Sequence, residues 1–186
     1  MFTSITGFAA VILYVGGFCY LLTKLLKQPN VNTSMLQTLA GGAIVLHGLS
    51  TVQLVFVADG LDLSLFRIFV LIAFVINLVV FVSGRKKPLH SMYLLLFPIS
   101  ALSLIAALET PSTKPAALMS PYIQSHIVIS ILAYSLLAIA ALHALLTGYQ
   151  NWQLKHKKQN LLMRTFPPLQ TMEDFLFELI LAGEIM

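Results

Sequence analysis

The chain has 186 residues, of which 58% are hydrophobic and 10% are charged, whereas an ordinary soluble domain is about 25% charged. A soluble globule cannot hide this much apolar surface, and a disordered chain is far more polar, so a water-soluble enzyme and a disordered protein are both excluded. The single cysteine also excludes an internal disulfide framework and a zinc site built from several cysteines.

Five apolar runs follow one another along the chain, and each is long enough to cross a membrane. A helix needs about 20 apolar residues to span a hydrocarbon core of about 30 Å. The pattern therefore predicts an all-α, polytopic transmembrane helix bundle that forms a single membrane domain over residues 1–186. The five predicted spans are 5–26, 36–57, 63–83, 92–108 and 122–147.

A sixth apolar run begins near Thr171 and is still apolar where the sequence stops at Met186. The stretch 172–186 would form a helix of about 22 Å, which is short of a full span. We therefore expect this sequence to be the N-terminal part of a longer protein.

Two helix starts are also predicted: Ser120 before Pro121 is typical of an N-cap, and Thr171 with Asp174 is typical of a capping box.

The net charge of +4 is explained by the distribution of basic residues over alternate loops. These residues are Lys24 and Lys27, then Arg85, Lys86 and Lys87, then Lys155, Lys157, Lys158 and Arg164. The loops between them carry acidic residues and few bases, as the positive-inside rule requires. The pattern predicts an outside N-terminus and a cytoplasmic basic loop over residues 150–171, and we expect its first part, 150–164, to continue the fifth helix out of the membrane. Nucleic acid is not expected as a partner, whereas membrane lipid is.

His47 is the most informative polar residue at membrane depth. It lies near the middle of the second predicted span, with Gly41, Gly42 and Gly48 close to it in the sequence. An ionisable side chain in lipid is costly and is a functional candidate by default. Two interpretations stay open: His47 ligates a cofactor that the glycines allow to approach, or it forms a hydrogen bond to a neighbouring helix and the glycines serve packing.

His126 lies one turn into the fifth predicted span, and Ser130 and Tyr134 follow it on the same helix face. An imidazole here could be an axial ligand for haem iron at the outer surface, or an interfacial histidine that meets head groups and water. His143 lies about 25 Å further along the same helix and points elsewhere, so we interpret it as structural.

Other polar residues in the spans have simpler interpretations. Asn77 is predicted to form an interhelical hydrogen bond, and Arg67 is predicted to pair with Asp62 near the outer interface. Glu184 would need a partner if the sixth helix spans the membrane, and His47 is one candidate. The sequence has no P-loop, no GxSxG elbow and no HExxH motif, so no conventional hydrolase or ATPase chemistry is predicted.

The region around the fifth span carries a family resemblance. It reads His126-Ile-Val-Ile-Ser130-Ile-Leu-Ala-Tyr134-Ser-Leu-Leu-Ala-Ile-Ala140, followed by Tyr149-Gln150, Leu154-Lys155, Pro167-Pro168-Leu169 and Met172-Glu173. This pattern resembles the cytochrome c assembly membrane family (CcsA, CcmC and HemX-like proteins), and it looks closest to the short YpjD-like branch of bacterial inner-membrane proteins. The specific matching covers about residues 120–175.

The resemblance implies a multi-pass protein of the bacterial inner membrane that binds or presents haem during cytochrome c maturation. It implies His126 as an outer haem ligand, His47 as an intramembrane ligand, and apocytochrome c or other maturation proteins as partners. The sequence departs from the family pattern because its one tryptophan, Trp152, is not part of a tryptophan-rich outer segment. Two alternatives remain: a HemX-like regulator of haem biosynthesis that acts through its basic loop, and a transporter of small solutes or metal ions.

Overall fold

The computed structural model of the chain describes residues 2–27, 32–57, 60–85, 89–111, 120–157 and 166–185. Over these residues the fold is all-α, as predicted, apart from one β-hairpin whose two strands have two residues each. The elements in chain order are α1 Phe2–Lys27, α2 Thr33–Val55, β1 Phe56–Val57, β2 Gly60–Leu61, α3 Leu65–Ser83, the 3-10 helix η1 His90–Met92, α4 Tyr93–Glu109, α5 Pro121–Lys155 and α6 Leu169–Ile185.

Five stretches of the described chain are long and apolar enough to cross a membrane. They are Thr3–Lys24, Thr33–Val55, Leu65–Ser83, His90–Glu109 and Pro121–Lys155. Each contains one of the five runs predicted from the sequence, or nearly all of it. Much of the surface of these helices is apolar and exposed, which suits contact with lipid. The prediction of five spans is therefore confirmed, and the outside location of the N-terminus stays a prediction.

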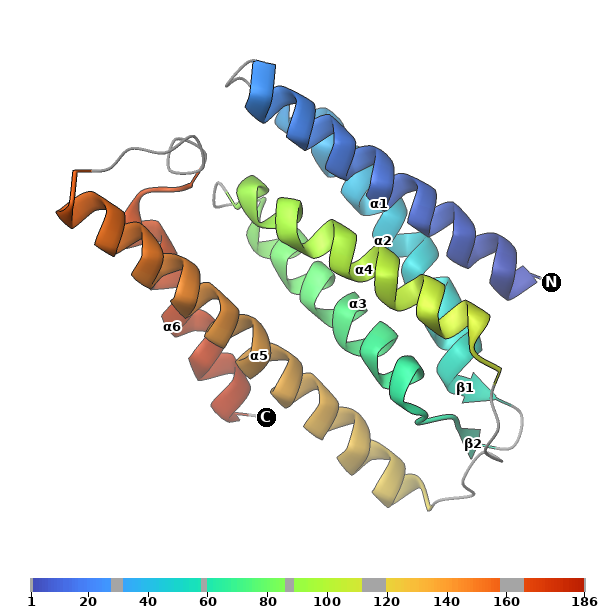
Figure 1. The fold of residues 1–186 in the computed structure, drawn as a ribbon. Helices are drawn as coiled ribbons and strands as arrows, with labels where there is room; N and C mark the ends of the chain where they lie inside the picture. Colours follow the sequence, from blue (N-terminus) through green and yellow to red (C-terminus); the bar gives the residue numbers. More distant parts are fainter. Residues whose placement is uncertain are drawn as a thin grey trace.

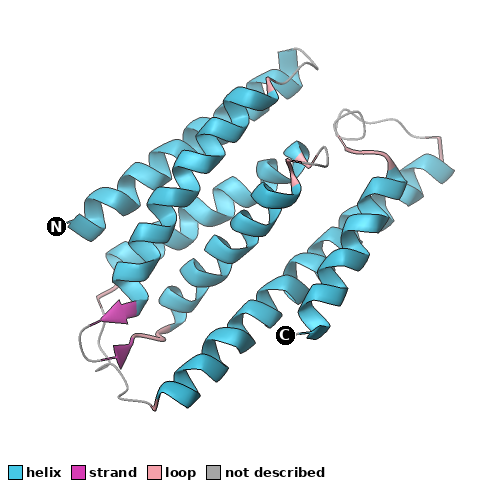
Figure 2. Cartoon of the chain, turned by 180° about the vertical axis from the view of Figure 1, so that it is seen from behind, coloured by secondary structure: helices cyan, strands magenta, loops and turns pink. Residues whose placement is uncertain are grey.

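Helices α1 to α4 form one bundle, in which α1 and α3 each pack on both α2 and α4. Figure 1 shows α5 and α6 as an antiparallel pair beside this bundle, which α5 joins through its contacts with α3. The N-terminus, the β-hairpin and the start of α5 lie at one end of the molecule (Figures 1 and 2). We call this the hairpin end, and we call the opposite end, which carries Lys24, Arg85 and Lys155, the basic end.

Two of the helices begin with the caps that their sequences favour. Ser120 is the N-cap of α5, where its hydroxyl accepts a hydrogen bond from the Ile123 amide and Pro121 occupies the first turn, as predicted. Asn32 caps α2 by accepting a hydrogen bond from the Met35 amide at 3.1 Å. These side chains satisfy amide groups that a helix start otherwise leaves without partners.

The core of the four-helix bundle is built from aromatic rings packed against small residues. Tyr14 and Phe97 are fully buried, and their ring centroids lie 5.3 Å apart. Gly17 makes room for Phe97, because a Cβ atom at this glycine would lie 2.5 Å from the ring. Close approach of this kind is the usual role of small residues between membrane helices.

Two polar interactions predicted from the sequence are present between the helices. Asn77 in α3 donates a hydrogen bond to the Ser100 hydroxyl in α4 at 2.6 Å. Arg67 pairs with Asp62 at 3.6 Å, and its guanidinium also donates to the carbonyls of Ala107 and Thr110 at the end of α4. Arg67 therefore satisfies carbonyl groups at a helix C-terminus rather than extending into the interface.

Helix α5 continues to Lys155, so the predicted continuation of the fifth helix is present over residues 150–155; Gln150 and Gln153 are buried on this extension, which explains its order. Two other predicted boundaries differ from the structure. Helix α6 begins at Leu169, so Thr171 lies inside the helix and is not its N-cap. Helix α2 stops at Val55, because the chain turns into the β-hairpin. Residues 158–165 of the basic loop lie outside the described residues.

Candidate functional site

His47 lies inside the four-helix bundle and has no exposed surface. Its Nδ1 atom is 2.9 Å from the Tyr14 hydroxyl of α1, and its Nε2 atom is 3.2 Å from the Val70 carbonyl of α3. A carbonyl can only accept, so Nε2 carries the hydrogen and Nδ1 accepts from the tyrosine. Both ring nitrogens are therefore engaged, and His47 links α2 to two neighbouring helices.

Aromatic rings enclose the His47 ring further. Tyr14 and Phe74 meet it edge to face, with centroids 5.6 and 5.7 Å away. An open apolar groove of about 550 Å³ runs between α2 and α3, and Gly48 and Phe74 line it, but His47 is not among its lining residues. A Cβ atom at Gly48 would lie 2.9 Å from the Phe74 ring, so this glycine accommodates a side chain of the protein itself.

His126 lies in the second turn of α5 at the hairpin end, and its side chain is exposed. Among the residues that the structure describes, none forms a hydrogen bond or an ion pair with it. Ser130 is half-buried, and Tyr134 is 70% exposed further along the same side of the helix. No described residue therefore occupies either nitrogen of the His126 ring, in contrast to those of His47.

The two candidate histidines do not share one site. The hydrogen bonds and ring contacts of His47 come from α1 and α3, and none comes from α5. By helical rise, His47 lies about 12 Å from the hairpin end of α2, whereas His126 lies about 8 Å from the start of α5. The described residues also contain no group of three His, Cys, Asp or Glu side chains that could hold a metal ion.

His143 is buried between α5 and α6, as its structural interpretation requires. Its Nε2 atom donates a hydrogen bond to the Met172 carbonyl at 2.8 Å, and its ring meets Phe175 edge to face. Its Nδ1 atom is buried without a partner among the described residues. His143 therefore fixes the α5–α6 pair in the same way that His47 fixes α2.

Glu184 does not reach His47. It lies exposed near the end of α6, which packs on α5, whereas His47 is enclosed by α1 and α3. The relay that a transporter would need from these two residues is not formed.

Sequence reasoning also missed Tyr14, although a tyrosine hydroxyl in the middle of an apolar helix is itself a signal that a buried partner exists.

The comparison with protein families decides the classification. A family model described as cytochrome C assembly protein matches residues 35–186. The chain belongs to this family. The resemblance seen in residues 120–175 is thereby confirmed at the level of the family, and membership supports a role in cytochrome c maturation for a multi-pass membrane protein. The YpjD-like branch stays a prediction. A search of curated proteins and a search of solved structures gave no match.

The two histidines differ in how well they suit haem, with which family membership is compatible. Haem iron binds an imidazole nitrogen, which must be free of other partners. His126 meets this requirement, because its ring is exposed and makes no hydrogen bond with the described residues. His47 does not meet it in this conformation, because ligation would first break the bond to Tyr14 or to Val70.

Proposed function

We propose that this protein handles haem at the hairpin end of its helix bundle, in the service of cytochrome c maturation. His126 supplies the imidazole ligand, and Ser130 and Tyr134 present hydroxyl groups along the same side of α5. The single observation that supports this assignment is the exposed His126 ring, which has no hydrogen-bond partner among the described residues, in a member of the cytochrome c assembly family. The protein binds and orients the cofactor and carries out no bond-making step itself.

His47 has a different part in this proposal. Its two hydrogen bonds hold α2 between α1 and α3, and so keep the four-helix bundle in register. The ligand role predicted for His47 from the sequence would require the ring to leave Tyr14. We therefore assign His47 a positioning role and leave iron ligation to His126.

The proposed setting is a bacterial inner membrane with the hairpin end outside. Basic residues then lie on the cytoplasmic side, as the positive-inside rule requires. In this orientation His126 faces the compartment where haem is attached to apocytochrome c, which is the proposed partner. The hairpin end carries the Asp62–Arg67 pair and the exposed Glu109, so it has no strong excess of either charge among the described residues.

Optical titration tests the haem proposal. The full chain, purified in detergent, is titrated with haemin while the Soret band is recorded. The wild type is expected to give the spectrum of a histidine-ligated haem, and His126→Ala is expected to lose it. Added imidazole should restore the spectrum in His126→Ala, because it replaces the missing ligand. His156→Ala is the matched control, since His156 is also exposed but lies at the basic end. Equal spectra for the wild type and His126→Ala would refute the assignment.

A second candidate function is regulation of haem biosynthesis through a soluble partner. Helix α5 has 35 residues and is therefore about 52 Å long, well beyond a hydrocarbon core of about 30 Å. Its last turn exposes Trp152 and Lys155, which a soluble protein could contact. Co-purification with wild type but not with Lys155→Glu/Lys157→Glu would favour this function. Partner binding that is unchanged in the double variant would argue against it.

A further inference from the structure

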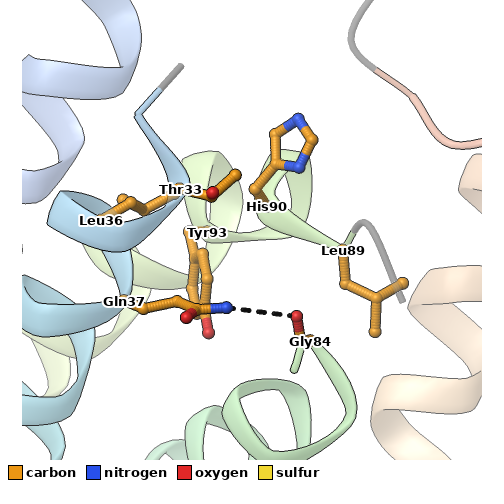
Figure 3. Close-up of a pocket in the computed structure, with 7 residues that line it drawn as sticks. All are labelled: Thr33, Leu36, Gln37, Gly84, Leu89, His90 and Tyr93. Atoms are coloured by element: carbon orange, nitrogen blue, oxygen red, sulfur yellow. Dashed lines mark hydrogen bonds between the residues drawn. The ribbon is translucent and has the colours of Figure 1, made fainter. Parts of the chain in front are cut away.

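A small pocket of about 120 Å³ lies at the basic end, where α2 begins and α3 gives way to α4. Figure 3 shows residues from three parts of the chain around this pocket. Thr33 and Gln37 come from α2, Gly84 follows α3, and His90 and Tyr93 come from the start of the α4 segment. The pocket lies where two candidate membrane spans begin, so its depth is that of the lipid head groups.

The hydroxyl group of Tyr93 is the unusual feature of this pocket. Tyr93 is 3% exposed, and its ring stacks on Phe97 with centroids 4.9 Å apart. Its side chain extends toward Gly84, such that a Cβ atom at this glycine would lie 3.8 Å from the hydroxyl oxygen. No described residue accepts or donates a hydrogen bond at this hydroxyl. The ring is buried, but the hydroxyl oxygen is not one of the buried atoms that lack a partner, so it opens into the pocket and can donate a hydrogen bond to a ligand there.

Other hydrogen-bond donors surround the same space. The Gln37 side chain donates to the Gly84 carbonyl at 3.4 Å, across the pocket (Figure 3). Thr33 is the first residue of α2, and the Asn32 cap satisfies the Met35 amide, whereas no described residue accepts a hydrogen bond from the amides of the first two helical residues. These groups attract a negatively charged ligand, as does the dipole of a 23-residue helix.

The charges near the pocket have one sign. Arg85 directly follows Gly84, which lines the pocket, and its guanidinium lies over the Phe81 ring, 4.7 Å from the ring centroid. Lys86 and Lys87 follow Arg85 in the sequence, and residues 32–57 and 65–108 contain no Asp or Glu at all. The acidic residues described at this end, Glu173 and Asp174, lie on α6, which does not line the pocket. An anion entering from the basic end therefore meets donors and positive charge.

From these observations we propose that the pocket binds a phosphate group, with the Tyr93 hydroxyl and the start of α2 as donors and Arg85 as the nearby positive charge. The depth of the pocket favours the phosphate of an anionic lipid head group as the source. A soluble phosphate compound presents the same chemistry and is the other source. The site lies at the opposite end of the helices from His126, so it is independent of the haem proposal.

Native mass spectrometry of the full chain tests the site, with phosphatidylglycerol as the lipid probe. Tyr93→Phe keeps the ring stacked on Phe97 and removes only the hydroxyl. A hydrogen bond to a charged group is worth enough that its loss should weaken binding by about tenfold or more. Tyr122→Phe is the matched control, because it removes an exposed hydroxyl at the hairpin end. Thr33→Val provides a second variant at the pocket and is expected to weaken binding in the same direction.

A parallel thermal-shift titration with inorganic phosphate distinguishes the two sources. If only phosphatidylglycerol stabilises the protein, the site binds lipid. If inorganic phosphate stabilises the wild type but not Tyr93→Phe, the site binds a soluble phosphate. Either result supports the site. Binding of both probes that is equal in the wild type and Tyr93→Phe overturns it. Weakening by Lys24→Gln as large as that by Tyr93→Phe also overturns it, because Lys24 does not line the pocket and would act through general attraction alone.

Discussion

Removing the Tyr14 hydroxyl should destabilise the bundle through His47. The variant Tyr14→Phe keeps the edge-to-face ring contact and deletes the 2.9 Å hydrogen bond to Nδ1. An interhelical hydrogen bond in a membrane protein contributes about 0.6 kcal/mol on average and at most about 1.7 kcal/mol. The variant also leaves a buried acceptor without a partner, which costs about 1 kcal/mol or more. The expected loss of unfolding free energy is therefore about 1–2 kcal/mol.

A double-mutant cycle isolates this interaction. His47→Leu removes both of its hydrogen bonds, and the double variant Tyr14→Phe/His47→Leu leaves no polar group unpaired at this position. The summed effects of the two single variants should exceed the effect of the double variant by about 0.6–1.7 kcal/mol. Equilibrium unfolding in SDS, followed by circular dichroism, measures each free energy. Tyr122→Phe is the control, because its hydroxyl is exposed.

The result that would refute this reasoning is additivity. If the two single effects sum to that of the double variant within about 0.3 kcal/mol, the two side chains do not interact in the folded protein. The positioning role proposed for His47 would then have no support, and the haem-ligand role predicted from the sequence would again be the favoured interpretation. Haem titration of His47→Leu separates these cases, because a positioning residue leaves the ligand spectrum intact.

Three further predictions concern packing and membrane exposure. Arg67→Gln should lower the unfolding free energy by about 1–3 kcal/mol, because buried carbonyls at the end of α4 lose their charged donor; an unchanged SDS midpoint would contradict this. Gly17→Ala should lower the unfolding free energy by about 1–3 kcal/mol, because the added Cβ atom clashes with Phe97. Gly16→Ala is the control and should not destabilise the fold, because the space around its Cβ position is open. Equal SDS midpoints for the two variants would contradict this packing. Cys19 is exposed on the surface of α1 that we expect to face lipid. In intact membranes it should therefore not react with a membrane-impermeant maleimide, and it should react once detergent gives access. Rapid labelling in intact membranes would place Cys19 outside the lipid.

Much of the fold could be predicted from the sequence, because lipid imposes one strong requirement on the backbone. Each apolar run must satisfy its own amide and carbonyl groups, so its length alone predicts a helix. Local chemistry also predicted the cap at Ser120 and the pair formed by Arg67 and Asp62. The continuation of α5 past residue 150 was also predicted, but its end at Lys155 was not, because the order of residues 150–155 depends on two buried glutamines that pack against neighbouring structure.

The candidate site was predictable only in part. The sequence drew attention to His47 because an imidazole in lipid needs a partner, but it could not say which partner. Tyr14 is the hydrogen-bond partner of His47 because of how α1 and α2 are rotated about their axes. No periodicity in this strongly apolar sequence predicts that rotation. The glycine at position 48 was open to two interpretations for the same reason, and the Phe74 ring occupies the space beside it. For His126 the sequence predicted the location, and its exposure is visible only in the structure.

The helix that carries His126 is buried unevenly along its length. All of the buried residues of α5 lie at or after Ser135, and the residues before Ser135 are exposed or half-buried. A ligand that docks beside His126 therefore meets side chains that are already at least partly exposed, so its affinity is reduced little by the work of opening a core.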